Sequence, residues 1–181
     1  MRVVYSELMN APVQGFSPSA AKPKAVMEAW LAQWPNLRVC APSPVSREDL
    51  YRAHARVFVD GVLELREANG FGTRSAEVAA SLPYTSGALL TAARWALELG
   101  GTVAAPVSGF HHAHWDEAAG FCTFNGLMVT ALALRAERPG LRVGILDYDY
   151  HYGDGTEDIL GRVGREGIVH VTAGADWRRG S

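Results

Sequence analysis

The sequence predicts a three-layer α/β/α fold with a mainly parallel sheet. Three segments rich in branched apolar residues, 102–107, 141–149 and 167–173, alternate with two segments of helical pattern, 125–140 and 155–163. Strands that alternate with helices form a parallel sheet because each helix carries the chain back across it. The run "LRVGILDYD" at 141–149 is apolar over most of its length, which is typical of a central strand buried on both faces.

The N-terminal hundred residues add one strand and three helices to this pattern. The strand is "RVVYS" at 2–6, and the helices lie within 17–35, after Ser46 and over 85–101. Ser46 is followed three residues later by an acidic residue, which is close to a capping box. The last of these helices takes Thr85 or Ser86 as its cap and ends at two glycines, and the segment 66–75 before it is a loop.

The composition is that of a globular protein, and we expect one domain over residues 1–181. Apolar residues make up 48% and charged residues 20%, and 17 basic against 19 acidic side chains give a net charge of −2. No block of lysine and arginine is present, so the sequence gives little support to nucleic-acid or membrane binding. Cys40 and Cys122 are expected to be free, buried thiols of a reducing compartment, and we expect a cytoplasmic protein.

Polar clusters follow the ends of the predicted parallel strands. They are "GFHHAHWDEAAGF" at 109–121, "DYDYHYGD" at 147–154 and "TAGAD" at 172–176. In parallel α/β sheets, ligands bind at the carboxyl ends of the strands. The sequence therefore predicts that these clusters meet at one functional site.

The strand end "DYDYH" places Asp147, Asp149 and His151 at every second position. In an extended chain, alternate side chains share one face, so these three converge while the intervening tyrosines face the packed side. A carboxylate and an imidazole two positions apart can both reach a divalent ion such as zinc or iron. The spacing alone is equally compatible with a solvated strand end.

Two adjacent histidines, His111 and His112, are candidates for a pair of acid–base groups near one reacting centre. Each needs a carboxylate on its outer nitrogen to fix its tautomer, and Asp147 and Asp154 are available for this. Without further context, such a pair is also compatible with an exposed surface. His114 has no assigned partner and is expected to be peripheral.

The segments "GFHHAHWDEAAGFCTFN" and "DYDYHYGDGTEDI" resemble the histone deacetylase family, including the bacterial acetylpolyamine amidohydrolases. Proteins of that family carry a His-His-Ala stretch, then Gly-Phe-Cys before an Asn, and then an Asp-x-Asp-x-His-x-Gly-Asn/Asp-Gly strand end. The resemblance runs over 109–158, and "SAEVAASLPYTSGALLTAARWAL" looks like the helix before it. It implies the arginase/deacetylase fold and the zinc-dependent hydrolysis of an acetyl amide on a lysine- or polyamine-like amine.

The resemblance implies roles for the two histidines and their partners. His111 and His112 would be the catalytic pair, one the general base toward water and the other an electrostatic or acid partner. Asp147 would orient His111, and Asp154 would orient His112.

The resemblance also implies a metal site and a substrate channel. Asp149 and His151 would be two protein ligands of a catalytic Zn²⁺ or another divalent ion. Gly120 and Phe121 would line the narrow tunnel for an acetylated small amine or an acetyl-lysine peptide. Backbone oxygens of 147–151 would hold a structural K⁺ ion.

The sequence departs from the family in length. It spans about half of a complete member, so the resemblance implies a truncated, N-terminal part of the domain. The family's third zinc ligand, an aspartate, and its transition-state tyrosine come later, and neither has a secure counterpart here. Asp176 in "GAD" looks locally like that aspartate, but it lies only 25 positions after His151, so we interpret it as part of the loop after 167–173. Weak or absent activity of this chain is therefore expected.

Two other interpretations stay open. A catalytically dead deacetylase-like module could bind acylated amines or a partner without turnover, and a structural or assembly subunit could use the same sheet. Arginase-type ureohydrolases share the fold, but they need more aspartates for two manganese ions and do not match the tandem histidines. A shortened sheet also leaves an exposed edge and an apolar face, which predicts a homo-oligomer.

Overall fold

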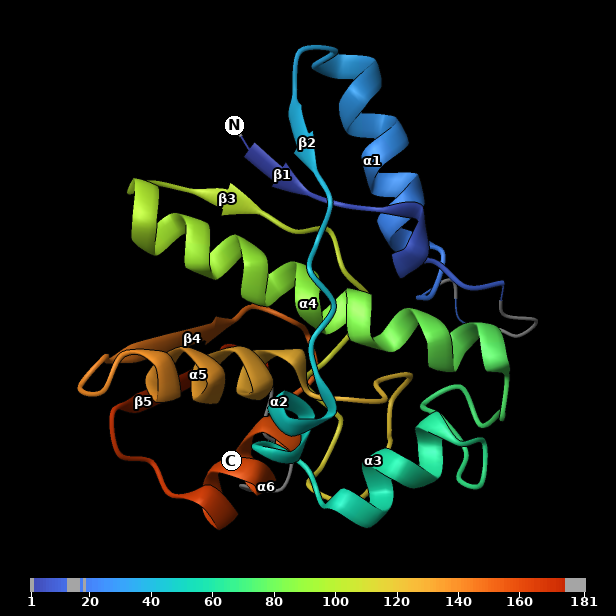
Figure 1. Ribbon diagram of the computed structural model, residues 1–181, viewed down its shortest axis with the longest axis vertical. Coiled ribbons are helices and arrows are strands. Elements are labelled where there is room, and N and C mark those ends of the chain that lie inside the picture. The colour runs from blue at the N-terminus through green and yellow to red at the C-terminus, as the bar shows by residue number, and fades with distance from the viewer. Residues whose placement is uncertain (1, 13–16, 18, 175–181) are drawn as a thin grey trace.

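The computed structural model describes residues 2–12, 17 and 19–174, and its helices and strands alternate along the chain (Figure 1). In chain order the elements are β1 (Arg2–Val4), η1 (Glu7–Met9), α1 (Lys22–Gln33), β2 (Arg38–Cys40), α2 (Arg47–Tyr51), α3 (Arg56–Leu63), α4 (Ala76–Leu99), β3 (Val103–Ala104), α5 (Gly126–Glu137), β4 (Val143–Asp147), α6 (Asp154–Val163) and β5 (Ile168–Thr172). None of the described helices is long and apolar enough to cross a membrane.

The strands form two parallel sheets instead of the single predicted one. β1 pairs with β2 and with β3, and β4 pairs with β5, all in parallel. The prediction of parallel strands joined by helices is thus confirmed, but the expectation that 102–107 and 141–149 share a sheet is wrong within the described residues. The short strand β3 makes its ladder with β1, and β4 makes its ladder with β5 alone.

Helix α4 connects the two halves of the molecule. It packs against β1 and β3 on one side and against α5 on the other (Figure 1). The predicted start of this helix at Thr85 or Ser86 is wrong, because both residues are buried inside a helix of 24 residues that begins at Ala76. Ser75 caps it by accepting a hydrogen bond from the Val78 amide, and the helix continues through Pro83.

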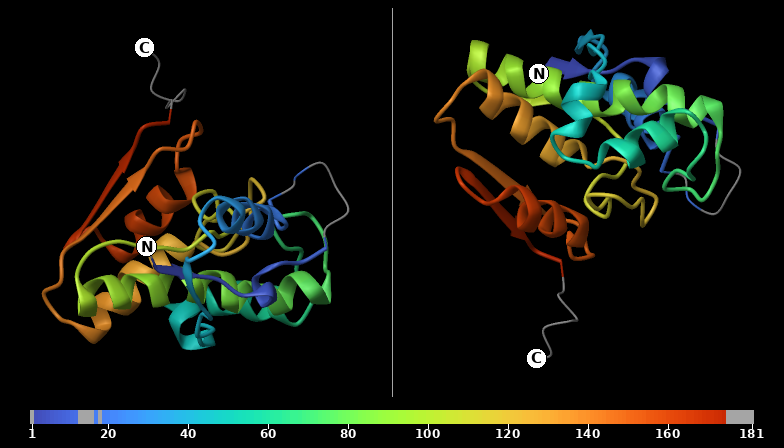
Figure 2. Two further views of the ribbon diagram at one scale, coloured as in Figure 1. Left: turned by 90° about the horizontal axis from the view of Figure 1, so that it is seen from above. Right: turned by 60° about the horizontal axis from the view of Figure 1, so that its bottom comes forward.

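The sheet of β4 and β5 is covered on one face only. Ile145 and Ile168 are buried in the main hydrophobic core with α5 and α6, which is the face that the alternation of side chains directs inward. On the opposite face, Leu146, Val169 and Val171 are each more than half exposed. The prediction that 141–149 is a strand buried on both faces is therefore wrong, because no described element covers that second face. Figure 2 shows the two strands at the margin of the molecule.

Side chains cap the starts of α2 and α5. Ser46 forms the expected capping box, in which its hydroxyl accepts from the Asp49 amide and the Asp49 carboxylate accepts from the Ser46 amide. Asn125 caps α5 by accepting from the Met128 amide. The loop before α5 and the start of α6 meet beyond the carboxyl end of β4, where the Thr156 amide donates to the His111 carbonyl.

Candidate functional site

Two histidine–aspartate pairs lie side by side at the carboxyl end of β4. His111 Nδ1 is 2.8 Å from Asp147 Oδ2, and His112 Nδ1 is 2.7 Å from Asp154 Oδ1. The centroids of the two imidazole rings are 4.0 Å apart. A carboxylate on Nδ1 keeps the hydrogen on that nitrogen and leaves Nε2 available for chemistry. The sequence-predicted partners are thus brought together, while their catalytic roles stay a prediction.

Three elements supply these four side chains. The histidines belong to the loop between β3 and α5, Asp147 is the last residue of β4, and Asp154 is the first residue of α6. The start of α6 packs directly on the histidine loop, and the Thr156 amide donates to the His111 carbonyl at 3.1 Å. A Cβ on Gly155 would lie 2.4 Å from the Ala113 carbonyl oxygen, so only glycine permits this approach.

A buried histidine that the sequence did not single out holds the same loop. His54 Nδ1 donates to the His114 carbonyl at 2.8 Å, and its Nε2 accepts from the Asn125 amide at 2.8 Å. Together, the two bonds require the neutral ring with its hydrogen on Nδ1. Burial lowers the pKa of His54 to about 4, against a smaller opposing effect of the His114 and Trp115 carbonyls. His54 therefore joins the start of α3, the histidine loop and the cap of α5.

Asp149 and His151 line the same cavity as the histidine pair and are far more exposed. Their side chains are 51% and 63% exposed, and His151 Nδ1 is 3.2 Å from Asp149 Oδ1. His111 Nε2 is 3.8 Å from the same oxygen. Partial burial raises the pKa of Asp149, but the His151 amide and the neighbouring imidazoles of His111 and His151 outweigh this, so that its pKa is lowered overall.

The backbone after β4 turns sharply and does not continue as a strand. Asp147 Oδ1 accepts from the Asp149 amide at 3.0 Å, and Asp149 Oδ1 accepts from the His151 amide at 2.8 Å. The expectation that the tyrosines of this segment face the packed side is wrong for Tyr148 and Tyr150, which are 78% and 82% exposed. The Asp147 and Asp149 carboxylates therefore help to fix the backbone after β4.

The donor set of Asp149 and His151 fits part of a zinc site. A carboxylate oxygen and an imidazole nitrogen are ligands that zinc takes, and these two already face each other. Among the residues that the structure describes, no group of three His, Cys, Asp or Glu side chains could hold a metal ion. Asp176, the residue that resembles the family's later aspartate, lies outside the described residues.

The sequence predicted that His114 is peripheral. This prediction is wrong, because the His114 ring lies close to two carboxylates. Its Nε2 is 3.8 Å from Asp154 Oδ2, and its Nδ1 is 3.7 Å from Asp158 Oδ2. Burial raises the pKa of Asp154, but the hydrogen bond with His112 and the charges of His112 and His114 lower it overall. Asp154 thus lies between two imidazoles.

A cavity of about 540 Å³ opens onto the histidine pair and the Asp149–His151 pair. Its lining consists of Ser17, Ser19, Lys22, Gly109, His111, His112, Gly120, Phe121, Cys122, Asp149 and His151. Gly120 has a φ of +53°, and a Cβ there would lie 2.4 Å from the His112 ring. Phe121 follows with a φ of +63° and is 48% exposed at the rim. Burial raises the pKa of the Cys122 thiol to about 11, so this cysteine is a thiol at neutral pH.

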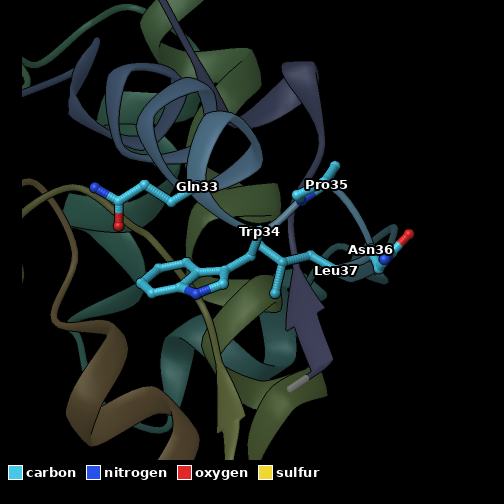
Figure 3. Close-up of a pocket in the computed structure, with 5 residues that line it drawn as sticks. All are labelled: Gln33, Trp34, Pro35, Asn36 and Leu37. Carbon is cyan, nitrogen blue, oxygen red and sulfur yellow. The ribbon is translucent and has the colours of Figure 1, made fainter.

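A larger hollow of about 630 Å³ lies elsewhere, after α1 (Figure 3). It is lined by the consecutive residues Gln33, Trp34, Pro35, Asn36 and Leu37. None of these side chains titrates or ligates a metal at neutral pH. The smaller cavity, in which imidazoles and carboxylates converge from separate elements, is therefore the candidate functional site.

An α/β fold that brings two histidine–aspartate pairs to the carboxyl end of a parallel strand has the architecture of deacetylase-like domains. The family model of the histone deacetylase domain matches residues 18–170. This chain belongs to the histone deacetylase domain family.

Relatives and solved structures agree with this assignment. The histone deacetylase-like amidohydrolase of Pseudomonas aeruginosa is 30% identical over 148 residues, which cover 77% of this chain and 38% of that protein. The acetylpolyamine amidohydrolase of Burkholderia pseudomallei is 39% identical over 66 residues, which cover 36% of this chain and 18% of that protein. The crystal structure of the HDA15 HD domain matches with a TM-score of 0.79 and 22% identity, over 94% of this chain and 52% of that one. The predicted arginase/deacetylase-like α/β fold is thus confirmed, and the chain spans about half of that solved domain.

Proposed function

We propose that this chain forms the histidine-bearing half of a zinc-dependent amidohydrolase that removes an acetyl group from a lysine- or polyamine-like amine. The observation that carries the proposal is the pair of adjacent histidine–aspartate contacts that share one cavity with Asp149 and His151. The names of the relatives, which include histone deacetylases and acetylpolyamine amidohydrolases, support an acetylated amine or an acetyl-lysine peptide as substrate.

In this proposal the two imidazoles move protons. Each Nδ1 is held by a carboxylate, so each Nε2 can accept a proton from water or return one to the leaving amine. Asp149 and His151 would hold the zinc ion, which when bound supplies a Lewis acid for the amide carbonyl. Gly120 lets the backbone approach His112 closely, and Phe121 offers an apolar wall to the methylene stem of the amine.

We further propose that residues 1–181 alone turn over substrate weakly or not at all. Catalytic zinc takes three protein ligands in most enzymes, and Asp149 and His151 are two. Holding acylated amines without turnover is the alternative that gains support where the described residues supply only these two ligands.

Turnover of an acetyl-lysine peptide and of an acetylated polyamine, measured with zinc titrated in, tests the proposal. Any zinc-dependent turnover should disappear with His111→Ala, while Leu146→Ala on the exposed sheet face should leave it unchanged. Zinc bound by the wild type and lost with His151→Ala supports the assigned ligands. Turnover that survives His111→Ala would contradict the assigned chemistry, and robust turnover by residues 1–181 would contradict the expectation of weak activity.

Three finer expectations remain proposals of ours. A structural K⁺ ion at the backbone oxygens of 147–151 should raise the melting temperature in potassium chloride above that in sodium chloride.

A homo-oligomer through the exposed face of β4 and β5 should sediment as a dimer at micromolar concentration, whereas a monomer there would contradict it. A cytoplasmic location should appear as recovery in the cytosolic fraction.

A further inference from the structure

Two arginines lie side by side at the amino ends of β1 and β2. Arg2 and Arg38 are the first residues of these strands and are register partners in the parallel ladder. Neighbouring strands lie about 4.7–4.9 Å apart, so the two side chains leave the same face of the sheet close together. Like charges that lie opposite each other on paired strands repel. This pair of cations therefore calls for a compensating negative charge.

The two arginines lie on the sheet face that α4 covers further along the strands. Side chains alternate along a strand, so Arg2 shares its face with Val4, and Val4 is buried in a cluster with Ala92 of α4. At Gly100, which has a φ of +68°, the chain leaves α4 and turns toward β3. Figure 1 shows the end of α4 beside the start of β3. The helix thus ends where the arginines begin.

A hollow of about 330 Å³ opens at this place. Its lining consists of Arg2, Asn36, Arg38, Gly100, Thr102 and Val103. The guanidinium groups, the amide and the hydroxyl in this set all donate hydrogen bonds, and none of these lining residues is Asp or Glu. Small-molecule sites have volumes of about 300–1,000 Å³, so the hollow has room for an anion with a small group attached.

The charges of Arg2 and Arg38 are not neutralised by a carboxylate. In the part of the chain that the structure describes, neither side chain forms an ion pair or a hydrogen bond. Arg94 and Arg165, by contrast, each pair with a glutamate. The carboxyl end of α4 supplies about half a negative charge, which is less than the two full positive charges of the arginines. The hollow therefore keeps a net positive charge.

We propose that the Arg2–Arg38 hollow binds a phosphate group, either free phosphate or the phosphate of a small monoester. Each guanidinium presents a planar fork of donors that matches two phosphate oxygens. A phosphate monoester carries a charge of about −1.5 to −2 at pH 7, which offsets both arginines, whereas a carboxylate offsets one. The hollow lies at the amino ends of β1 and β2, away from the histidine–aspartate pairs that follow β4, so this inference does not depend on the proposed hydrolysis.

Nitrogen-15 NMR of the arginine side chains in the 181-residue chain tests the site directly. Sodium phosphate is titrated against sodium chloride at equal ionic strength. The Nε signals of Arg2 and Arg38 should shift together and saturate with one dissociation constant, while Arg74, an exposed arginine that does not line the hollow, should not shift. Arg38→Gln should weaken phosphate binding at least about tenfold, because a charge-assisted pair of hydrogen bonds is lost. Arg38→Lys keeps the charge without the fork and should restore part of the affinity.

Thermal unfolding gives a second measurement. In sodium chloride, Arg38→Gln should melt at the wild-type temperature or above it, because the repulsion from Arg2 is removed. Phosphate stabilises folded proteins in general, so the signature of the site is the difference between variants. Phosphate should stabilise the wild type and the matched control Arg74→Gln equally, and both more than the double variant Arg2→Gln/Arg38→Gln.

The choice of anion separates the possible sources of the phosphate group. Tighter binding of glycerol phosphate than of inorganic phosphate supports a phosphorylated small molecule, and equal binding supports free phosphate. Acetate that binds as tightly as phosphate would contradict the proposal. Equal stabilisation of the wild type and the double variant, or shifts at Arg2 and Arg38 no larger than at Arg74, would also overturn it. The wild-type titration decides this even if a variant fails to fold.

Discussion

The histidine–aspartate pairs and the Asp149–His151 pair lie in one cavity but differ in how the protein supports them. His111 and His112 are 11% and 20% exposed and are each held by a carboxylate from a separate element. Asp149 and His151 are at least half exposed and contact mainly each other. The histidine–aspartate pairs, the proposed acid–base part of the candidate site, are thus largely buried and held between separate elements, while Asp149 and His151, its proposed metal-binding part, are exposed. Changes behind the histidines should therefore be costly, and changes at the proposed metal ligands should be tolerated.

The largest effect is expected from Gly155→Ala. The new Cβ would lie 2.4 Å from the Ala113 carbonyl oxygen, which is backbone and cannot swing away, so α6 must separate from the histidine loop. We expect the free energy of unfolding to fall by about 3 kcal/mol, in the range for overpacked sites, and the His112–Asp154 contact to be lost.

Gly161→Ala is the matched control on the same helix, since nothing lies within 4 Å of its added Cβ. Alanine is the better helix former, so this change should stabilise the protein by up to about 1 kcal/mol. Urea denaturation of both variants makes the comparison. Equal effects would show that the packing of α6 on the histidine loop does not support the site.

A pH dependence should follow from His54. The unfolded chain takes up a proton near the ordinary pKa of 6.5, whereas the folded ring does so only near pH 4. The stability from neutral His54 is therefore complete above pH 6.5 and is lost as the pH falls toward 4, by about 3 kcal/mol. Denaturation at several pH values should show this loss in the wild type. A His54→Gln variant with the same slope across that window would disprove the assignment.

The smallest effects separate the two aspartates. Asp147→Asn should cost about 1–3 kcal/mol, because Asp147 uses both oxygens as acceptors, one for the Asp149 amide and one for His111. Asp149→Asn should change stability by less than about 0.5 kcal/mol, because a single oxygen of this exposed side chain accepts both contacts from His151. Thermal or urea unfolding of the two variants at neutral pH tests this contrast. A costly Asp149→Asn would show that the metal-binding part is built as firmly as the acid–base part.

The sequence predicts the parts of the site that carry repeated or paired signals. The tandem histidines, the alternating Asp147, Asp149 and His151, and the resemblance of both segments to one family are enough to bring these residues together. His54 was missed, because a single histidine between two helices has no spacing that distinguishes it from an ordinary core residue.

The errors in the fold have a common cause. Two hydroxyl residues suggested a helix start at Thr85 or Ser86, but buried packing from Val78 to Ala92 favours one long helix from Ala76. The apolar run at 141–149 suggested burial on both faces, because local sequence records the character of a strand and not which neighbours cover it. Sequence therefore predicted strands and helices well, and their surroundings less well.

The backbone at Phe121 has a positive φ, which bulky side chains rarely adopt. A bulky residue with a φ of +63° costs about 1–3 kcal/mol relative to relaxed backbone, and glycine would remove that cost. Phe121 keeps its ring 6.2 Å from that of Phe71, between centroids, and holds it at the rim of the cavity. The strain at Phe121 thus accompanies an aromatic side chain that shapes the entrance of the cavity.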